Sequence, residues 1–338
     1  MKKLVAMLLV FTMSISLAAC GGNKSSESTS GESKANESTV GDTKAAEENT
    51  AASVENSGEP VSGGTVNIPI TDDPTTLQGW MLRNTNESAL APAIYETLLR
   101  YDETGKPQPF LLESFEGDPE ALTYTMVVRD GITFQDGTPL DAEAVKWNLD
   151  YYKENGVLTG SYFNYVESVE VVDDKTVVVH MSQWDALFDY GLARTCFICS
   201  PTAVESLGVD GFNEMPVGTG AFKVTKWVHG EGIYTEKYDQ YWQGTPYLDG
   251  VNFKIYASTA TQQTALEVGD LDIMNLTGDA ITADALKAKG YSMSNAAIPS
   301  TGYTLCFNSQ ADGPLKDLRV RQAIAYAVDT KAICDSLL

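Results

Sequence analysis

The stretch from Gly21 to Pro60 constrains this chain most, because it contains no Phe, Trp, Tyr, Ile, Leu, Met or Cys. Its three lysines and eight acidic residues leave a net charge of −5. Such a segment cannot bury enough apolar surface to offset the entropy that it would lose on folding. We therefore predict a disordered tether over residues 20–61 and a folded region from about Gly64 onward.

The N-terminus carries the pattern of an export signal. Two lysines, Lys2 and Lys3, precede an apolar run from Leu4 to Leu17, which is typical of a signal peptide and short for a permanent membrane span. The junction Leu17-Ala18-Ala19-Cys20 resembles a bacterial lipobox, in which the cysteine receives lipid and becomes the first mature residue. We expect a lipoprotein signal peptide at 1–19 and lipid on Cys20. The alternative is an ordinary secretory peptide with an incidental cysteine.

Charge and motifs exclude several classes of function. With 46 acidic and 23 basic residues, the 338-residue chain has a formal charge of −23, which repels nucleic-acid phosphates. Its two histidines, His180 and His229, lie far apart in the sequence. No phosphate loop is present, and the sequence Gly218 to Lys223 lacks the third glycine of a dinucleotide loop. We expect no cofactor, no metal site and no nucleic-acid partner.

Periodicity predicts a mixed α/β fold in more than one lobe. Strands are expected at 65–70, 124–129, 132–134 and 271–274, with hairpins at 169–181 and around 228–232. Helices are expected at about 88–100, from an Asp141 cap to 152, and from a Thr259–Gln262 capping box to near Gly269. A further helix begins at Asp317 and runs to Leu338 without a stop signal, so we expect the chain to be a fragment.

Two features of the apolar stretch 187–199 stand out. Cys196 and Cys199 have redox or metal spacing, but in an extended strand their side chains point to opposite faces, so we expect two semi-buried thiols. Cys306 and Cys334 are likewise expected to be small core residues. Arg194 is the single cation of the stretch. It suits either bidentate capture of a carboxylate or a structural ion pair, with Asp189 or with an acid elsewhere in the fold.

Several long motifs, in one order, resemble the family 5 extracellular solute-binding proteins, the peptide, nickel and opine receptors of ATP-binding-cassette importers. The matching segments are Tyr95–Asp102, Leu122–Thr125, Val128–Phe134, Asp136–Pro139, Val217–Lys223, Tyr241–Trp242, Leu266–Ile273 and Arg319–Asp329.

The resemblance implies a two-lobed clamshell of the periplasmic-binding-protein-like type II class. The first lobe would comprise 62–90 plus 215–305, with a β-rich subdomain inserted at 91–214. Residues 306–338 would begin a second lobe that is mostly missing. Residues 303–308 would form the first crossing strand into it, which makes Tyr303, Phe307 and Asn308 hinge candidates.

The resemblance also implies ligand-binding residues. The loop of Arg83, Asn84, Thr85 and Asn86 would lie at the cleft mouth. Arg194 resembles one arginine of a pair that, in nickel-type members, grips a carboxylate-bearing chelator. The second position of that pair is Phe197 here, a departure from the nickel-type pattern.

We therefore interpret the protein as a monomeric, lipid-anchored receptor on the outer face of the cytoplasmic membrane. It would capture oligopeptides by lobe closure, without catalysis, and deliver them to permease subunits. One alternative is a receptor for a nickel chelate or another small anion or small molecule. An alternative from another class is a surface hydrolase that uses two carboxylates.

The lipobox generates the first testable prediction. Replacing Cys20 with Ser removes the thiol that accepts lipid, so the Cys20→Ser protein should move from the membrane fraction into the medium. Immunoblotting of washed membranes and culture medium measures this shift. A variant that stays on membranes through detergent-free washing would contradict the lipoprotein interpretation.

Overall fold

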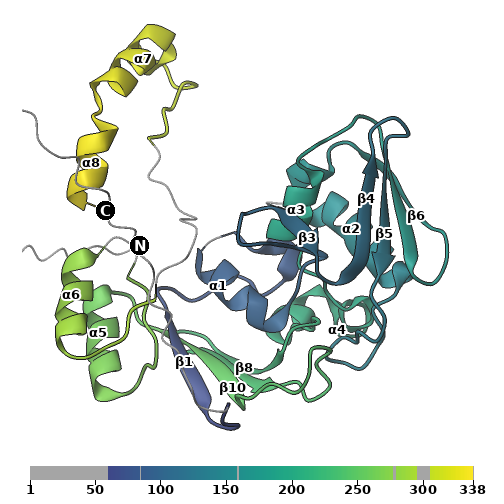
Figure 1. Ribbon diagram of the computed structural model, residues 1–338, viewed down its shortest axis with the longest axis horizontal. Helices are drawn as coiled ribbons and strands as arrows, with labels where there is room; N and C mark the ends of the chain where they lie inside the picture. The colour runs from purple at the N-terminus through teal and green to yellow at the C-terminus, as the bar shows by residue number, and fades with distance from the viewer. Residues whose placement is uncertain (1–59, 84, 158–159, 277–278, 295–304, 338) are drawn as a thin grey trace, which may run out of the picture. The chain divides into compact units, whose positions relative to one another are not determined.

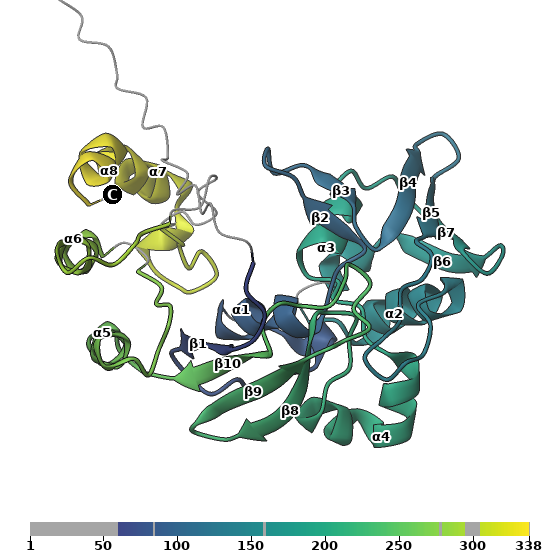
Figure 2. The same cartoon turned by 60° about the horizontal axis from the view of Figure 1, so that its bottom comes forward.

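Strands far apart in the sequence meet in the first sheet. The structure is a computed structural model that describes residues 60–338 except 84, 158–159, 277–278, 295–304 and 338. The sheet has the order β1 (Thr65–Ile70), β10 (Gly250–Ile255), β9 (Gly232–Lys237) and β8 (Phe222–Val228). β1 runs parallel to β10, and β8 and β9 form the expected hairpin (Figures 1 and 2).

A second four-stranded sheet is antiparallel throughout. Its order is β4 (Leu112–Asp118), β5 (Thr123–Val128), β7 (Thr176–Met181) and β6 (Val166–Val171). Half-buried and buried residues alternate along β5 and β7, so one face of this sheet packs into the core. A two-stranded sheet pairs β2 (Leu99–Tyr101) with β3 (Pro107–Pro109). The mixed α/β class is therefore confirmed.

Helices connect and cover these sheets. α2 (Ala142–Asn155) packs against β6 and β7, and α1 (Thr85–Ile94) packs against β8 (Figures 1 and 2). The other helices are η1 (Gly79–Met81), η2 (Gly160–Phe163), α3 (Phe188–Arg194), α4 (Pro201–Glu214), α5 (Thr259–Val268), α6 (Ala280–Ala288), η3 (Pro314–Lys316), α7 (Leu318–Ala327) and α8 (Thr330–Leu337). No helix of the described residues has the length and apolar character needed to cross a membrane.

Local signals for caps and turns are largely confirmed. The carboxylate of Asp141 accepts a hydrogen bond from the amide of Ala144 at 2.8 Å and begins α2. Asp317 caps α7, and Gly269 ends α5 with a φ of 82°, a left-handed conformation that glycine adopts without strain. The cap of α5 differs from the prediction: its capping box joins Ser258 and Thr261, one residue earlier than expected.

The helix predicted at 88–100 is wrong at both ends. α1 begins at Thr85, so Thr85 and Asn86 belong to the helix and not to the preceding loop. It ends at Ile94, and the following residues turn into the extended segment that leads to β2. Thr97 pairs with Phe197, and β2 pairs with β3. Long-range pairing overrides the local helical pattern here.

Two predicted strands are not formed. Within 132–134, only an isolated bridge joins Thr133 to Pro139, because the chain folds back in a tight turn. Residues 271–274 are also not a strand. Beside β1, Asp272 makes two bonds to Asn67: its amide donates to the Asn67 carbonyl at 3.0 Å, and its carboxylate accepts from the Asn67 amide at 2.8 Å.

The C-terminal predictions need three corrections. The single helix is two helices, because Val328 has extended backbone and separates α7 from α8. Within the predicted crossing strand 303–308, residues 305–308 are described and are not a strand, since none of the described strands pairs with them. Cys306 is exposed and is not a core residue. Tyr303 and the side chain of Cys334 lie outside the described residues.

A buried segment, Cys196–Ser200, connects the surrounding elements. The amide of Ile198 donates to the carbonyl of Glu96 at 2.8 Å, and the amide of Ser200 donates to Val217 at 3.0 Å. From α2, the Asn148 side chain bonds both the amide and the carbonyl of Cys199, each at 2.9 Å. Both thiols are fully buried rather than semi-buried, and burial raises their pKa, which disfavours the reactive thiolate. The Cys196–Cys199 pair is structural.

The proposed division at 62–90 plus 215–305, 91–214 and 306–338 stays a prediction. Two separate sheets are present: β1, β8, β9 and β10 share one, and β4, β5, β6 and β7 form the other. The Cys196–Ser200 segment lies inside the predicted subdomain, yet it contacts both regions: Cys199 pairs with Gly218 and Thr97 pairs with Phe197. The boundary is thus crossed by backbone pairing.

Removing the Asn148 amide should destabilise the fold. Asn148→Ala leaves the amide and carbonyl of Cys199 without partners inside the core, which we expect to cost about 2–4 kcal/mol in the free energy of unfolding. Chemical denaturation measures this loss. The matched control is Asn155→Ala on the same helix, whose side chain makes an exposed bond to Tyr151, and it should change stability by less than about 0.5 kcal/mol. Equal losses in both variants would contradict the role assigned to Asn148.

Candidate functional site

Arg194 lies on a helix and not in a strand. It is the last residue of α3, and its side chain is exposed. Across the described residues, no hydrogen bond or ion pair joins its guanidinium group to a carboxylate. The Asp189 carboxylate instead accepts from the amide of Tyr190 at 2.8 Å, so the predicted ion pair between Asp189 and Arg194 is not formed. Within the described part of the chain, the Arg194 guanidinium is therefore exposed and has no acidic partner.

Three tyrosines lie around α3, which packs against β2 and β3 (Figures 1 and 2). The hydroxyl of Tyr101 donates to the carbonyl of Tyr190 at 3.1 Å, and the two ring centroids are 6.0 Å apart. Tyr162 packs against Gly191, where an added Cβ would lie 2.4 Å from the tyrosine ring. A side chain at position 191 would displace that ring. We call Tyr101, Tyr162, Tyr190 and Arg194 the tyrosine–arginine cluster.

Electrostatics link the members of this cluster. Burial raises the pKa of Tyr101, while the nearby positive charge of Arg194 lowers it. Burial also raises the pKa of Asp189. The raised pKa keeps Tyr101 uncharged at neutral pH. A planar guanidinium near the Tyr101 side chain suits a carboxylate carried on an apolar or peptide body.

The predicted cleft-mouth loop is held by a buried carboxylate. Glu87, in the first turn of α1, is fully buried. It accepts from the amide of Arg83 at 2.6 Å and from the amide and hydroxyl of Thr75 at 3.1 and 2.6 Å. An acid in the first turn also suits the positive end of the helix. The bond to Glu87 fixes the backbone of Arg83, while the side chain of Arg83 is exposed and its guanidinium is accessible.

The structure does not bring all the predicted residues together. Among the described atoms, no bond or ring contact joins Arg83 to Arg194. Asn84 and Tyr303, the side chains of Thr85 and Asn86, and Cys20 lie outside the described part of the chain. Asn308 accepts from the amides of Gln310 and Ala311 at 3.2 and 3.1 Å, which shapes a local turn, while the nearby Phe307 is half-buried. Their hinge role stays a prediction.

Sequence reasoning missed the three tyrosines. Tyr190 and Arg194 are four residues apart, which places them on one face of a helix, so this pair had a readable signal once α3 is assigned as helix. Tyr101 and Tyr162 come from distant segments and had none.

Glu96 and Asp189 are carboxyl groups whose pKa is raised by burial. Glu96 is 6% exposed and accepts from the Tyr241 hydroxyl at 2.5 Å and the Trp242 indole at 2.8 Å. Its carboxylate is thus buried and bonded to two side chains of the fold. In the described part of the chain, no three His, Cys, Asp or Glu side chains gather in a way that could hold a metal ion.

Comparison with known proteins identifies the family. Residues 106–338 match the bacterial extracellular solute-binding proteins, family 5 middle region, and the chain belongs to this family. The glutathione-binding protein GsiB of Salmonella paratyphi A is 30% identical over 264 residues, which cover 77% of this chain and 51% of that protein. The chain thus spans about half the length of the curated relatives that it matches.

Solved structures agree on the fold. MoaA from A. tumefaciens R10, in complex with mannopinic acid, matches with a TM-score of 0.69 at 24% identity, covering 82% of this chain and 57% of that one. The oligopeptide-binding protein AppA from Bacillus subtilis, in complex with a nonapeptide, matches with a TM-score of 0.60 at 26% identity, covering 68% and 47%. The fold is that of the periplasmic-binding-protein class, and the match is to part of each clamshell.

The buried carboxyl of Glu96 should make stability depend on pH. Its pKa is raised in the folded state, so the folded chain binds more protons than the unfolded chain at pH values above the ordinary glutamate pKa. Stability from this group is therefore greatest at low pH and falls as pH rises toward the raised folded pKa. In Glu96→Gln this fall should disappear, so the variant should lose less stability than the parent between about pH 4 and pH 7. Urea denaturation at both pH values measures the free energy of unfolding. An equal loss of unfolding free energy in the parent and in Glu96→Gln would contradict the assignment.

Proposed function

We propose that this chain is part of a receptor that captures oligopeptides for an ATP-binding-cassette importer. The receptor would be held by lipid on Cys20 at the outer face of the cytoplasmic membrane and would deliver its ligand to permease subunits. Membership of an extracellular solute-binding family supports the extracytoplasmic location. A tether over residues 20–61 would place the folded region away from the lipid surface.

Relatives and the candidate site both support a peptide as the ligand. GsiB is named for glutathione, and AppA was solved with a nonapeptide, so both bind peptides. A peptide carries a terminal carboxylate. The observation that carries the proposal is the accessible guanidinium of Arg194, which has no carboxylate partner in the described chain and lies near enough to Tyr101 to lower its pKa.

We infer that the Arg194 guanidinium donates two parallel hydrogen bonds to the ligand carboxylate, while Tyr101 and Tyr190 contact the adjoining atoms. The rigidity of this arrangement comes from α3, where Tyr162 fits against Gly191 and the Tyr101 hydroxyl bonds the helix backbone. Binding would favour a closed arrangement of two lobes through its greater affinity for that state. The mechanism needs no bond to be made or broken, so the proposal is for a receptor and not an enzyme.

A nickel chelate or another small anion is the competing ligand, because a chelator's carboxylate would suit Arg194 equally well. Phe197 occupies the position of the second arginine that nickel-type members use, and it is only 7% exposed. A buried aromatic ring offers no charge to a second carboxylate. This favours a ligand with one carboxylate to be gripped at this end, such as a peptide.

Arg194 should contribute to binding and not to folding. In the complete natural protein, Arg194→Ala should weaken binding of a short peptide by about 1.5–3 kcal/mol, the usual contribution of a charge-assisted hydrogen bond. Arg194→Lys keeps the charge but loses the two-bond fork, so its affinity for the peptide should lie between those of the parent and Arg194→Ala. The melting temperature without ligand should stay within about 2 °C of the parent in both variants. Calorimetry and thermal denaturation measure the two quantities.

A matched pair of ligands makes the test specific. The same peptide with a free or an amidated C-terminus should differ in affinity for the parent protein, and this difference should vanish in Arg194→Ala. Nickel–histidine is measured in parallel, and tighter binding of that complex than of any peptide would establish the competing ligand. A loss of stability in Arg194→Ala with unchanged affinity would overturn the role of Arg194.

A further inference from the structure

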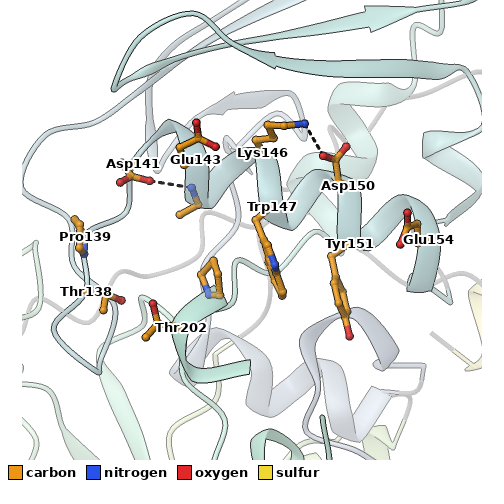
Figure 3. Close-up of a pocket in the computed structure, with 12 residues that line it drawn as sticks. Thr138, Pro139, Asp141, Glu143, Lys146, Trp147, Asp150, Tyr151, Glu154 and Thr202 are labelled. Atoms are coloured by element: carbon orange, nitrogen blue, oxygen red, sulfur yellow. Dashed lines mark hydrogen bonds and ion pairs between the residues drawn. The ribbon is translucent and has the colours of Figure 1, made fainter. Parts of the chain in front are cut away.

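A surface cavity of about 580 Å³ lies along α2, apart from the tyrosine–arginine cluster. Its walls come from α2, the turn before it and the beginning of α4 (Figure 3). Trp147 and Tyr151 project from the same side of α2, and Thr138, Pro139 and Thr202 lie near the beginning of that helix (Figure 3). The volume falls within the range of small-ligand pockets, about 300–1,000 Å³.

The aromatic side of the cavity is fixed by stacking. Trp147 and Tyr151 are four residues apart on the helix, and their rings stack with centroids 4.5 Å apart. Tyr151 meets the buried Trp80 edge-on at 4.8 Å, and Trp80 stacks on the buried Phe212 at 5.3 Å. The two outer rings remain half-buried. A series of contacts from the core to the surface thus holds the two rings in place at the cavity, with one face of each ring covered by the other.

The charges around these rings are mostly negative. Asp141, Glu143, Asp150 and Glu154 line the cavity with a single cation, Lys146. Two of these carboxylates are occupied, because Asp141 caps α2 and Asp150 pairs with Lys146 at 2.7 Å. Glu143 and Glu154 are exposed and make no hydrogen bond or ion pair within the described chain.

We propose that this cavity binds a small organic cation, namely a guanidinium or ammonium group carried on an apolar chain. Cations are attracted to the face of an indole or phenol ring, most strongly to tryptophan. The apolar chain would cover the rings, and Glu143 and Glu154 would supply the opposite charge. A cavity with this combination of rings and carboxylates repels the anions that suit Arg194. The site is therefore distinct in chemistry from the proposed peptide site.

The test uses two uncharged-backbone probes that differ only at the end of the side chain. N-acetyl-arginine amide carries a guanidinium, and N-acetyl-citrulline amide carries a neutral urea of nearly the same shape. Calorimetry on the whole chain should show saturable binding of the arginine probe and at least about tenfold weaker binding of the citrulline probe. Trp147→Ala should weaken the arginine probe by about tenfold or more, and Trp147→Phe by less.

Charge variants and controls complete the experiment. Glu143→Gln combined with Glu154→Gln should weaken the arginine probe by about two- to fivefold, while Glu120→Gln, an exposed acid in the turn after β4, should leave it unchanged. Arg194→Ala should also leave it unchanged, so this proposal and the proposed receptor function fail independently. Thermal denaturation verifies that each variant is folded. Equal binding of the two probes, or no saturable binding by the folded parent, would overturn the proposal.

Discussion

The buried segment Cys196–Ser200 is the contact on which the rest of the structure depends. It is extended but belongs to neither four-stranded sheet, so its polar groups need partners of other kinds. Asn148 supplies two bonds, and the Tyr152 hydroxyl donates to the carbonyl of Phe197 at 2.8 Å. At Gly79, an added Cβ would lie 2.8 Å from the Cys199 sulfur, so η1 approaches this segment closely. Helix α3 ends at Arg194, with only Thr195 between it and the segment, and α4 begins directly after the segment at Pro201.

That position explains how the scaffold holds the candidate site. Arg194 stands one residue from Thr195, which ends α3 through a bond from its amide to the carbonyl of Gly191 at 3.2 Å. The backbone after Arg194 is therefore fixed by the core, while its side chain remains in solvent. The tyrosines fix the other side of the helix. A binding group on a rigid element loses little freedom when ligand arrives, which is the benefit of preorganisation.

The sequence predicted what depends on neighbouring residues. The two hairpins, the Asp141 and Asp317 caps and the glycine that ends α5 follow from local turn and cap chemistry, and the structure has them. The helix at 88–100 failed because Thr97 has a partner a hundred residues away, which no local pattern reports. The strand predicted at 271–274 is not formed, and there Asp272 bonds Asn67 of β1 once through its amide and once through its carboxylate.

The residues of the candidate site were likewise only partly predictable from the sequence. Arg194 was singled out by its charge in an apolar stretch, and Tyr190 lies on its helix face. Tyr101 and Tyr162 were unpredictable, since only the folded chain brings β2 and η2 to α3. The Cys196–Cys199 motif suggested chemistry by its spacing, but burial gave it a structural role. Short motifs report composition and distance along the chain, whereas burial is set by the whole fold.

Because of the net charge, ligand affinity at the two proposed sites should depend differently on salt concentration. The chain carries −23, so an anionic ligand approaches Arg194 against the field of the whole protein. Added salt screens that repulsion as well as the local attraction, and because the distant charges are the more strongly screened, binding of an anion should be weakened little or even strengthened. A cation that approaches Trp147 and Tyr151 is attracted by the field of the whole protein, and Lys146, the one cation of the lining, is paired with Asp150, so added salt should weaken its binding. An anion site on such an acidic protein must therefore rely on short-range geometry, which is what α3 and its tyrosines provide.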